Sequence, residues 1–557
     1  MDNQVHEKGM VSAGHHLAAE AAAEILSLGG NAVDAGVAGG LALGVVQSDY
    51  VNIGGVAPIM VRTPDGQVAT IDGVGPWPAA TDPDYLRQTY GGHIPTGVLR
   101  SVVPAAPAAW IAALDRYGTM SFSDVAQAAI RFASKGFPMH WLMHGMIVKN
   151  RAGYAKWPSN AAIYLPNGKP PEIGQNFIQS DLAATLQYMA DADCASQRKG
   201  RTAGLQAARA AFYTGDIASA ICSYHAAEGG WLKREDLARY QVAFGEAVSA
   251  NLSKGTLLCS GAYSQGPFLA QLMLLLDRFD WSDTAPSSGE GLHRLLECVK
   301  IAFSDREACL GDPDFVAVPL ERILTPDYLT ERLQLFSPDL AMPDMPQSSL
   351  GPHKLTFADQ AQPSPGDTSY IAVVDADGLA FSATPSDVSY ASPVIPGTGI
   401  CASPRGSASW TAQDHPSSVE PGKRPRLTPN PAIWLGHQGE IMPFGTPGGD
   451  MQIQAMAQFL LNRLYRGMPL QAAAEEPRAG SYSFPSSFSP HESHPNLVRA
   501  EAALPCEVRE ALSALGHNVE VWPQRSPLAG AICAVEYARG EFTSAADPRR
   551  PTGEAGA

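Results

Sequence analysis

The chain has 557 residues, of which 45% are hydrophobic and 17% are charged, as is typical of a folded protein with a sizeable core. The net charge of -16 at pH 7, without any basic cluster, argues against a nucleic acid partner. Residues 1–8 lack the apolar run of a secretory signal, and the apolar run 35–46 is too short to span a membrane. We therefore expect a cytoplasmic protein with no membrane partner, or a periplasmic one if a leader precedes this sequence.

Eight cysteines lie scattered along the chain without a Cys-x-x-Cys pair. This spacing favours reduced thiols over a disulfide framework or a structural zinc site. His140 and His144 have the i, i+4 spacing of metal ligands, but the neighbouring Trp141 and Met143 indicate packing. We expect no metal and no other cofactor.

The first part of the chain predicts one hairpin among several helices. An Ala-rich helix over 18–28 stops at a Gly-Gly pair. Strands over 56–61 and 68–72 are separated by a Pro-Asp-Gly turn, which favours a hairpin. Further helical patterns cover residues 107–117, 122–133 and 268–276.

A second block of strands follows a segment rich in Pro, Ser and Gln at 346–366, which is the most linker-like part of the chain. The expected strands cover residues 371–374, 380–384 and 433–435, with a hairpin turn at 375–378. An early and a late strand pair with helices between them indicate sheets covered by helices.

Thr368 lies between this linker and the strand over 371–374. A cut directly before a threonine exposes a hydroxyl nucleophile and an α-amine that can act as its base. An Asp-Thr-Ser triplet is by itself more often a turn or a helix cap. The hypothesis of a threonine nucleophile therefore depends on the rest of the chain.

The segment 367–378 resembles the start of the small subunit in the γ-glutamyltranspeptidase family, where a Thr-(Thr/Ser)-aromatic sequence leads into a strand ending in Asp and Gly. Other segments resemble motifs of that family in the same order, so the resemblance covers nearly the whole chain. These segments are 9–12, 25–35, 212–215, 229–231, 236–240, 311–315, 396–400, 423–425, 445–449 and 545–549. The divergent acylase branch, with its cephalosporin acylases and oxamate amidohydrolases, is the most similar part of the family.

This resemblance implies an α+β fold, the four-layer αββα sandwich of N-terminal-nucleophile hydrolases, built from two chains of one precursor. Cleavage between Asp367 and Thr368 would give a large subunit, 1–367, and a small catalytic subunit, 368–557, that form one heterodimeric unit. Thr368 would then be both nucleophile and base.

The resemblance also implies two further catalytic elements. Ser386 stands where the family usually has a second threonine, with an exposed turn as the alternative reading. Gly448 and Gly449 match paired glycines whose backbone N–H groups form an oxyanion hole. A plain turn is the alternative for the glycines.

Four positions depart from the transpeptidases at polar contacts to the donor's amino-acid head group: Val74, Val388, Ala408 and Leu427. Because each charged hydrogen bond contributes roughly 1.5–3 kcal/mol, a site without these contacts should not strongly favour γ-glutamyl donors. Arg405 and Arg426 are candidates to anchor an acyl carboxylate, with Thr428 as a further substrate contact. Surface positions are the alternative for both arginines.

The sequence thus predicts a self-processing amidohydrolase or acylase that acts on small-molecule amides through an acyl-enzyme. Glutaryl-type acyl groups, such as those on cephalosporins, are the favoured donors, with γ-glutamyl transfer or hydrolysis as an additional activity. The alternatives are a glutathione hydrolase or γ-glutamyltransferase proper, and a small-amide hydrolase such as an oxamate amidohydrolase. A pseudoenzyme that only binds ligands is the non-enzymatic alternative.

Overall fold

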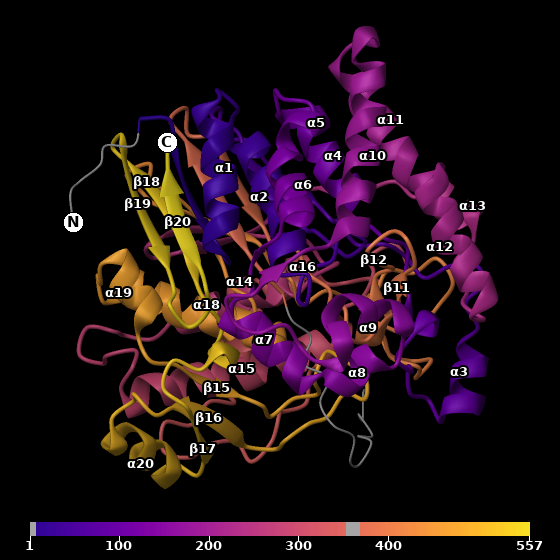
Figure 1. Cartoon of the computed structure of the whole chain (residues 1–557). Helices are drawn as coiled ribbons and strands as arrows, with labels where there is room; N and C mark the ends of the chain where they lie inside the picture. Colours follow the sequence, from indigo (N-terminus) through magenta and orange to yellow (C-terminus); the bar gives the residue numbers. More distant parts are fainter. Residues whose placement is uncertain (1–6, 352–367) are drawn as a thin grey trace.

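The computed structural model describes residues 7–351 and 368–557, and it contains two stacked antiparallel sheets between layers of helices (Figure 1). The first sheet has the order β20 (Gly553–Gly556), β1 (Gly9–Ala13), β9 (Ile371–Asp375), β10 (Ala380–Ala383), β2 (Ile59–Arg62), β3 (Val68–Ile71) and β6 (Phe244–Gly245). The second has the order β19 (Glu541–Ala546), β18 (Cys533–Ala538), β14 (Ile441–Gly445), β13 (Ala432–Leu435), β8 (Gly255–Cys259) and β7 (Val248–Leu252).

Strand β9 is buried on both faces, which explains its continuous apolar sequence. Tyr370, at its start, Ala372 and Val374 pack in the core between the two sheets. Ile371 and Val373 point the other way, into the core beneath the helices. The alternation follows from the two-residue period of a strand.

Helices cover the outer face of each sheet. α1 (His16–Ser27) and α2 (Ala32–Val46) share the apolar core of the first sheet, and α14 (Gly266–Leu276), α15 (Gly289–Cys309) and α18 (Gln452–Leu460) share that of the second. The αββα arrangement predicted from the resemblance is therefore confirmed.

Helix α2 contains the apolar run 35–46, and every one of its residues is buried. Its small residues let it lie close to the sheet, since a Cβ on Gly36 would come within 2.2 Å of the Phe381 ring. In the described part of the chain, no helix has the length and apolarity needed to cross a membrane.

The remaining elements surround these layers. The helices are α3 (Pro83–Tyr90), α4 (Ala106–Tyr117), α5 (Phe122–Val125), α6 (Gln127–Lys135), α7 (Trp141–Lys149), α8 (Arg151–Ala155), α9 (Pro158–Tyr164), α10 (Ser180–Ser196), α11 (Arg201–Tyr213), α12 (Asp216–Ala227), α13 (Arg234–Arg239), α16 (Leu320–Ile323), α17 (Pro326–Leu333), α19 (Leu470–Glu475) and α20 (Cys506–Ala514). The short strands are β4 (Phe137–Pro138), β5 (Asn176–Phe177), β11 (Val394–Ile395), β12 (Ile400–Cys401), β15 (Ala479–Ser481), β16 (Leu497–Glu501) and β17 (Asn518–Trp522).

Most elements expected from the sequence are present, including both hairpins and the helices α1, α4 and α14. Two differ. The helix expected over 122–133 is divided into α5 and α6 at Ala126. The first strand begins at Ile59, because Val56 pairs with Ser386 only as an isolated bridge. All eight cysteines are free thiols, as their spacing suggested.

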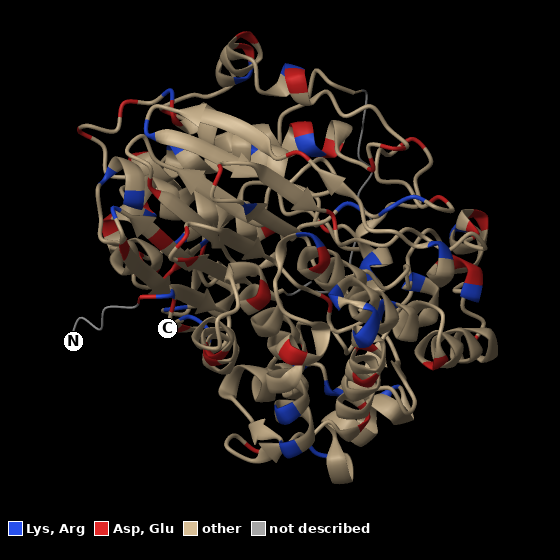
Figure 2. Ribbon diagram, turned by 90° about the horizontal axis from the view of Figure 1, so that it is seen from above, with Lys and Arg blue, Asp and Glu red and all other residues tan. Residues whose placement is uncertain are grey.

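The ribbons of the two sheets carry few charged residues, whereas Lys, Arg, Asp and Glu are interspersed around the periphery (Figure 2). The two signs are mixed and do not form a broad basic face.

Burial lowers the pKa of several histidines, to about 4 for His140 and His225 and to about 3 for His415 and His517. As the pH falls below about 6.5, the unfolded chain binds protons that these folded histidines do not bind. Each then lowers the free energy of unfolding by about 1.4 kcal/mol per pH unit until its folded pKa is reached. Buried Asp72, whose pKa is raised to about 6, acts in the opposite direction.

We therefore expect the melting temperature to fall between pH 7 and pH 5, measured by differential scanning fluorimetry in buffers of equal ionic strength. His225→Leu is a matched control, because neither ring nitrogen of His225 has a hydrogen-bond partner among the described residues. Its pH dependence should be shallower than that of the unaltered protein. A melting temperature that is constant or rises on acidification would contradict the expectation.

Candidate active site

Thr368 lies immediately before β9, at the end of the strand that is buried between the layers. Its Oγ1 is 3.0 Å from the Oγ of Ser386, and the two residues form an isolated antiparallel bridge. The next residue, Ser369, donates its N–H to the Pro385 carbonyl at 3.0 Å. The β9–β10 hairpin therefore brings the two predicted hydroxyl groups into hydrogen-bonding contact.

Ser386 is fully buried, so the alternative of an exposed turn is wrong. Its N–H donates to the Val56 carbonyl at 3.0 Å, and its carbonyl accepts from the Val56 N–H at 3.4 Å. This pairing extends the sheet beyond β2 and β10. The Ser386 side chain is consequently held on the Thr368 side of the strand end.

Arg405 lies beside this pair and is buried, with 3% of its surface exposed. Its guanidinium donates from Nε to Asp387 Oδ1 at 2.8 Å and from Nη2 to Ser386 Oγ at 2.5 Å. The Ser403 hydroxyl donates to the other carboxylate oxygen of Asp387. Burial raises the pKa of Asp387, and Arg405 partly offsets that rise.

Gly448 and Gly449 lie in the loop between β14 and α18, with φ angles of +124° and +58°. Glycine adopts such angles without the steric cost that a Cβ brings. A short 3-10 turn, Gly449–Met451, leads from this loop into α18, so the loop precedes a helix N-terminus, as the sequence indicated.

Arg550 connects this loop with Thr368. It donates from Nη1 to the Thr368 carbonyl at 3.4 Å and from Nη2 to the Pro527 carbonyl at 3.0 Å. Three residues after Pro527, the Gly530 Cα lies 3.7 Å from where a Cβ on Gly448 would stand. The link between Thr368 and the glycine pair is thus indirect.

Gln265 lies beneath the glycine loop. Its side-chain amide donates to the carbonyls of Thr428 at 2.9 Å and Gly449 at 3.3 Å. Arg306 in turn donates to the Gln265 side chain at 3.2 Å and pairs with Asp450. The network holds the backbone of the glycine loop in place.

Arg426 is also buried, which contradicts the surface alternative for both candidate arginines. Its Nη2 lies 2.7 and 2.9 Å from the two carboxylate oxygens of Glu307. Burial alone would raise the pKa of Glu307, but Arg426 and Arg306 outweigh it and lower that pKa. Among residues 7–351 and 368–557, Nε and Nη1 of Arg426 and Nη1 of Arg405 have no hydrogen-bond partner.

Two of the four departures from the transpeptidase pattern lie in one cluster. Val74 and Leu427 pack with Val56 and Tyr263 in a small buried apolar cluster, which we call the Val74 cluster. Because Val56 pairs with the backbone of Ser386, this cluster adjoins the hydroxyl pair. Two further departures, Ala408 and Val388, are also buried, with 0% and 8% of their surfaces exposed.

The sequence analysis also singled out Asp367 and His140. Asp367 lies outside the described residues. His140 caps the N-terminus of α7, accepting from the Met143 N–H, while its other nitrogen faces the Val46 carbonyl. Its partners are therefore the backbone groups of Met143 and Val46.

Sequence reasoning missed Asp387 and Arg306. Asp387 had a local signal, since an acid directly follows Ser386, but the turn interpretation hid its burial. Arg306 had no local signal, because its partners Gln265 and Asp450 are 41 and 144 residues away in the chain.

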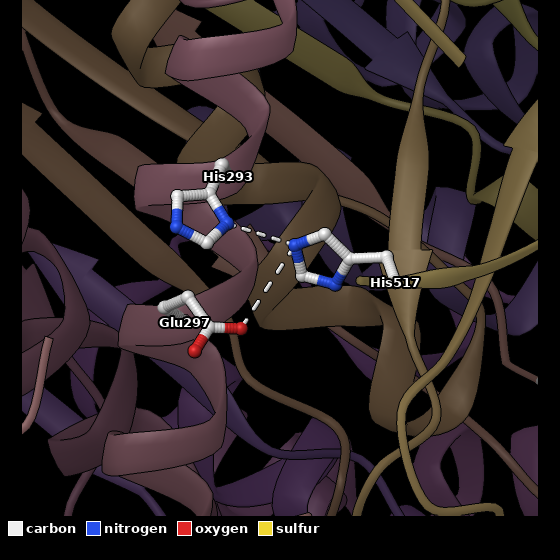
Figure 3. A group of neighbouring side chains, drawn as sticks. All are labelled: His293, Glu297 and His517. Atoms are coloured by element: carbon white, nitrogen blue, oxygen red, sulfur yellow. Dashed lines mark hydrogen bonds and ion pairs between the residues drawn. The ribbon is translucent and has the colours of Figure 1, made fainter. Parts of the chain in front are cut away.

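Figure 3 shows another group of buried titratable side chains, formed by His293 and Glu297 of α15 and by His517 just before β17. His293 Nδ1 lies 2.8 Å from His517 Nε2, and His293 Nε2 lies 2.8 Å from the Ser337 carbonyl. Lys300 Nζ is 2.8 Å from Glu297 Oε1 and already supplies the positive charge that a metal would bring. We interpret the group as a polar network that fastens the β17 region to α15.

Comparisons with known proteins identify the family of this chain. Residues 18–557 match the family model of gamma-glutamyltranspeptidase. The chain is 30% identical to the acylase ACY 1 proenzyme of Pseudomonas sp. (strain SE83), over 95% of this chain and 90% of that protein. It is 31% identical to the glutathione hydrolase-like YwrD proenzyme of Bacillus subtilis (strain 168), over 97% of each.

The crystal structure of cephalosporin acylase from Bacillus halodurans is similar with a TM-score of 0.85 and 25% identity, covering 100% of this chain and 97% of that one. The family model, the relatives and the shared fold all extend over nearly the whole chain. The chain therefore belongs to the gamma-glutamyltranspeptidase family and has the αββα fold of N-terminal-nucleophile hydrolases.

Proposed function

We propose that this protein is a self-processing amidohydrolase or acylase whose nucleophile is Thr368. The observation that carries the proposal is the 3.0 Å contact between the buried hydroxyls of Thr368 and Ser386 at the head of β9. Two hydroxyls held together at the end of a core strand suit proton transfer and nucleophilic attack. The proenzyme names of the similar acylase and hydrolase support a precursor that is cut.

Processing would begin with attack of Thr368 Oγ1 on the Asp367 carbonyl carbon. The C–N bond between the two residues breaks, the amide nitrogen takes a proton, and the acyl group moves to the threonine oxygen as an ester. Water then hydrolyses this ester, leaving the Asp367 carboxylate and a free α-amine on Thr368. The reference pKa of such an amine is about 7.7–8.0, so part of it is unprotonated at neutral pH.

In turnover, the α-amine would accept the proton of the Thr368 hydroxyl while Oγ1 attacks the amide carbonyl of the substrate. The backbone N–H groups of Gly448 and Gly449 would stabilise the oxyanion that develops. The amine then passes the proton to the leaving nitrogen. Water hydrolyses the resulting acyl ester, or an acceptor amine takes the acyl group.

The two products of cleavage, 1–367 and 368–557, would remain one heterodimeric unit. In the first sheet, β1 lies between β20 and β9, which follow the cut. In the second sheet, β8 pairs with β13 across the same division. Separating the chains would break these backbone ladders and expose the apolar core.

Glutaryl-type acyl groups are the donors that the site supports best. A glutaryl group is a γ-glutamyl group without the α-amine, and Ala408 stands where a transpeptidase has the acid for that amine. N–H donors of Arg405 and Arg426 remain without partners in the described chain and suit the acyl carboxylate. γ-Glutamyl hydrolysis is the second candidate, favoured by the YwrD-like relative.

N-terminal sequencing of the smaller fragment tests the position of the cut. We expect it to begin Thr-Ser-Tyr-Ile, because a cut before Thr368 frees the α-amine of the residue whose hydroxyl contacts Ser386. A fragment that starts elsewhere would exclude Thr368 as the nucleophile. A single band at 58.9 kDa on a denaturing gel would favour the pseudoenzyme instead.

Thr368→Ala should abolish both processing and activity, since hydroxyl and base belong to one residue. Thr368→Ser should still be processed, with lower activity, because it keeps the oxygen and loses the methyl that restricts the rotamer. Gel analysis over time and amide hydrolysis by the purified proteins measure both. Maturation of Thr368→Ala would mean that another residue or a protease cuts the chain.

Hydrolysis of the glutaryl, γ-glutamyl and butyryl p-nitroanilides tests the substrate preference. We expect kcat/KM for the glutaryl compound to equal or exceed that for the γ-glutamyl compound, because an ammonium placed against Ala408 and the Val74 cluster loses water without replacement. Each lost contact is worth roughly tenfold. The butyryl compound, which lacks the carboxylate, should be hydrolysed more slowly than the glutaryl one.

Ala408→Asp should shift the preference toward the γ-glutamyl compound, whereas the neutral Ala408→Asn is its matched control and should not. A strong γ-glutamyl preference in the unaltered protein would replace the acylase proposal with a glutathione hydrolase.

A further inference from the structure

We infer that Arg405 is a positioning residue that orients the Ser386 hydroxyl so that it donates its hydrogen toward Thr368, and that Asp387 fixes Arg405 for this purpose. The inference rests on the proposed role of Thr368 as nucleophile. It assigns Arg405 to the catalytic hydroxyl pair, in addition to any contact that its remaining N–H groups make with a substrate.

The donor groups of Arg405 limit how the Ser386 hydroxyl beside Thr368 can be oriented. A guanidinium carries only donors, so the contact from Arg405 Nη2 requires Ser386 Oγ to accept. Ser386 Oγ still has one hydrogen to donate, and Thr368 Oγ1, 3.0 Å away, is an acceptor within its reach, although this contact alone does not fix which oxygen donates. With a hydrogen bond arriving from Ser386, the Thr368 hydroxyl is oriented to donate its own hydrogen to the base.

Asp387 holds the guanidinium in place. Its Oδ1 lies 2.8 Å from Nε and 2.6 Å from Nη2, so Arg405 is clamped along one edge. The backbone of Asp387 has φ = +120°, which is costly for a residue with a side chain. Such strain persists where the surroundings demand it, and here it places the Asp387 carboxylate directly behind Ser386.

The charge of Arg405 acts in the same sense as the hydrogen bond. The Ser386 hydroxyl lies between the Arg405 guanidinium and Thr368 Oγ1, in a buried region where a charge is weakly screened. A fixed cation there favours the negative charge that moves through this oxygen during attack. It also disfavours protonation of the α-amine of Thr368, which must be neutral to act as the base.

Arg405→Lys is the decisive variant, because it keeps the charge and approximate size but loses the fork that contacts Asp387 and Ser386 together. We expect autocleavage and kcat for both glutaryl- and butyryl-p-nitroanilide to fall roughly 30-fold or more, with KM for the butyryl compound, which has no carboxylate to anchor, changed less than about threefold. The acidic limb of the pH profile of kcat/KM should move to higher pH in Arg405→Ala, where the cation is absent and Asp387 is left unpaired.

A double-mutant cycle with Ser386→Ala tests whether Arg405 acts through Ser386. If it does, Arg405→Lys should cause little further loss in the Ser386→Ala background. Two fully additive losses would overturn the inference. So would a rise in KM for the glutaryl compound alone with kcat and the pH limb unchanged, because that result describes a substrate anchor.

Two controls separate this role from a loss of folding. Arg100→Lys removes another buried guanidinium, which among the described residues donates only to the carbonyls of Ile94 and Pro95. The backbone carbonyl of Arg100 lies beside Gly406, the residue that follows Arg405. Arg100→Lys should leave kcat within about twofold. Millimolar guanidinium should partly restore kcat to Arg405→Ala if the cavity is intact, and absence of rescue in a folded variant counts against the inference.

The outcomes of the two proposals are distinguishable. If Thr368→Ala is processed and active, the proposed function fails whatever Arg405 does. If Thr368→Ala is inactive while Arg405→Lys keeps its kcat, its cleavage rate and its pH profile, the proposed function stands and only the role of Arg405 is rejected.

Discussion

The structure depends on the burial of β9 on both faces. Because Tyr370, Ala372 and Val374 fill the space between the sheets while Ile371 and Val373 fill the space beneath the helices, a slip of one residue would exchange the two sets. The pairing of β9 with both β1 and β10 fixes the same register from each side. The packing of the residues that follow Thr368 therefore helps to position it.

Buried ion pairs surround the candidate site, and stability is a poor explanation for them. Taking a guanidinium and a carboxylate out of water costs several kcal/mol for each ion, which their attraction repays only with good geometry and further hydrogen bonds. The Arg405–Asp387 and Arg426–Glu307 pairs have that geometry, and each also contacts a residue at or beneath the site. For the Arg405–Asp387 pair, the explanation that the geometry supports is the placement of N–H donors beside Ser386, the partner of the proposed nucleophile.

Local signals in the sequence were enough to predict α1, α14 and both hairpins, because glycine stops, turn residues and strand alternation act within a few residues. The contact of Thr368 with Ser386 was within reach as well, since a single hairpin separates them. The partners of Arg306 and the pairing of His293 with His517 were not, because these residues meet only when distant segments pack. The sequence identified Arg405 as a candidate. Its bond to Ser386 could not be predicted, because it depends on the buried turn that places Asp387 against Arg405.

The same contacts bear on substrate choice. The carboxylates of Asp387 and Glu307 partly offset the positive charges of Arg405 and Arg426, so the site offers a ligand less net charge than two unpaired cations would. What both arginines still offer is N–H donors without partners in the described chain, which suit an anionic oxygen. An ammonium group needs an acceptor instead, and the side chains of Ala408, Val74 and Leu427 provide none. Under the proposed function, hydrogen-bonding capacity, more than net charge, would separate a glutaryl group from a γ-glutamyl group in this site.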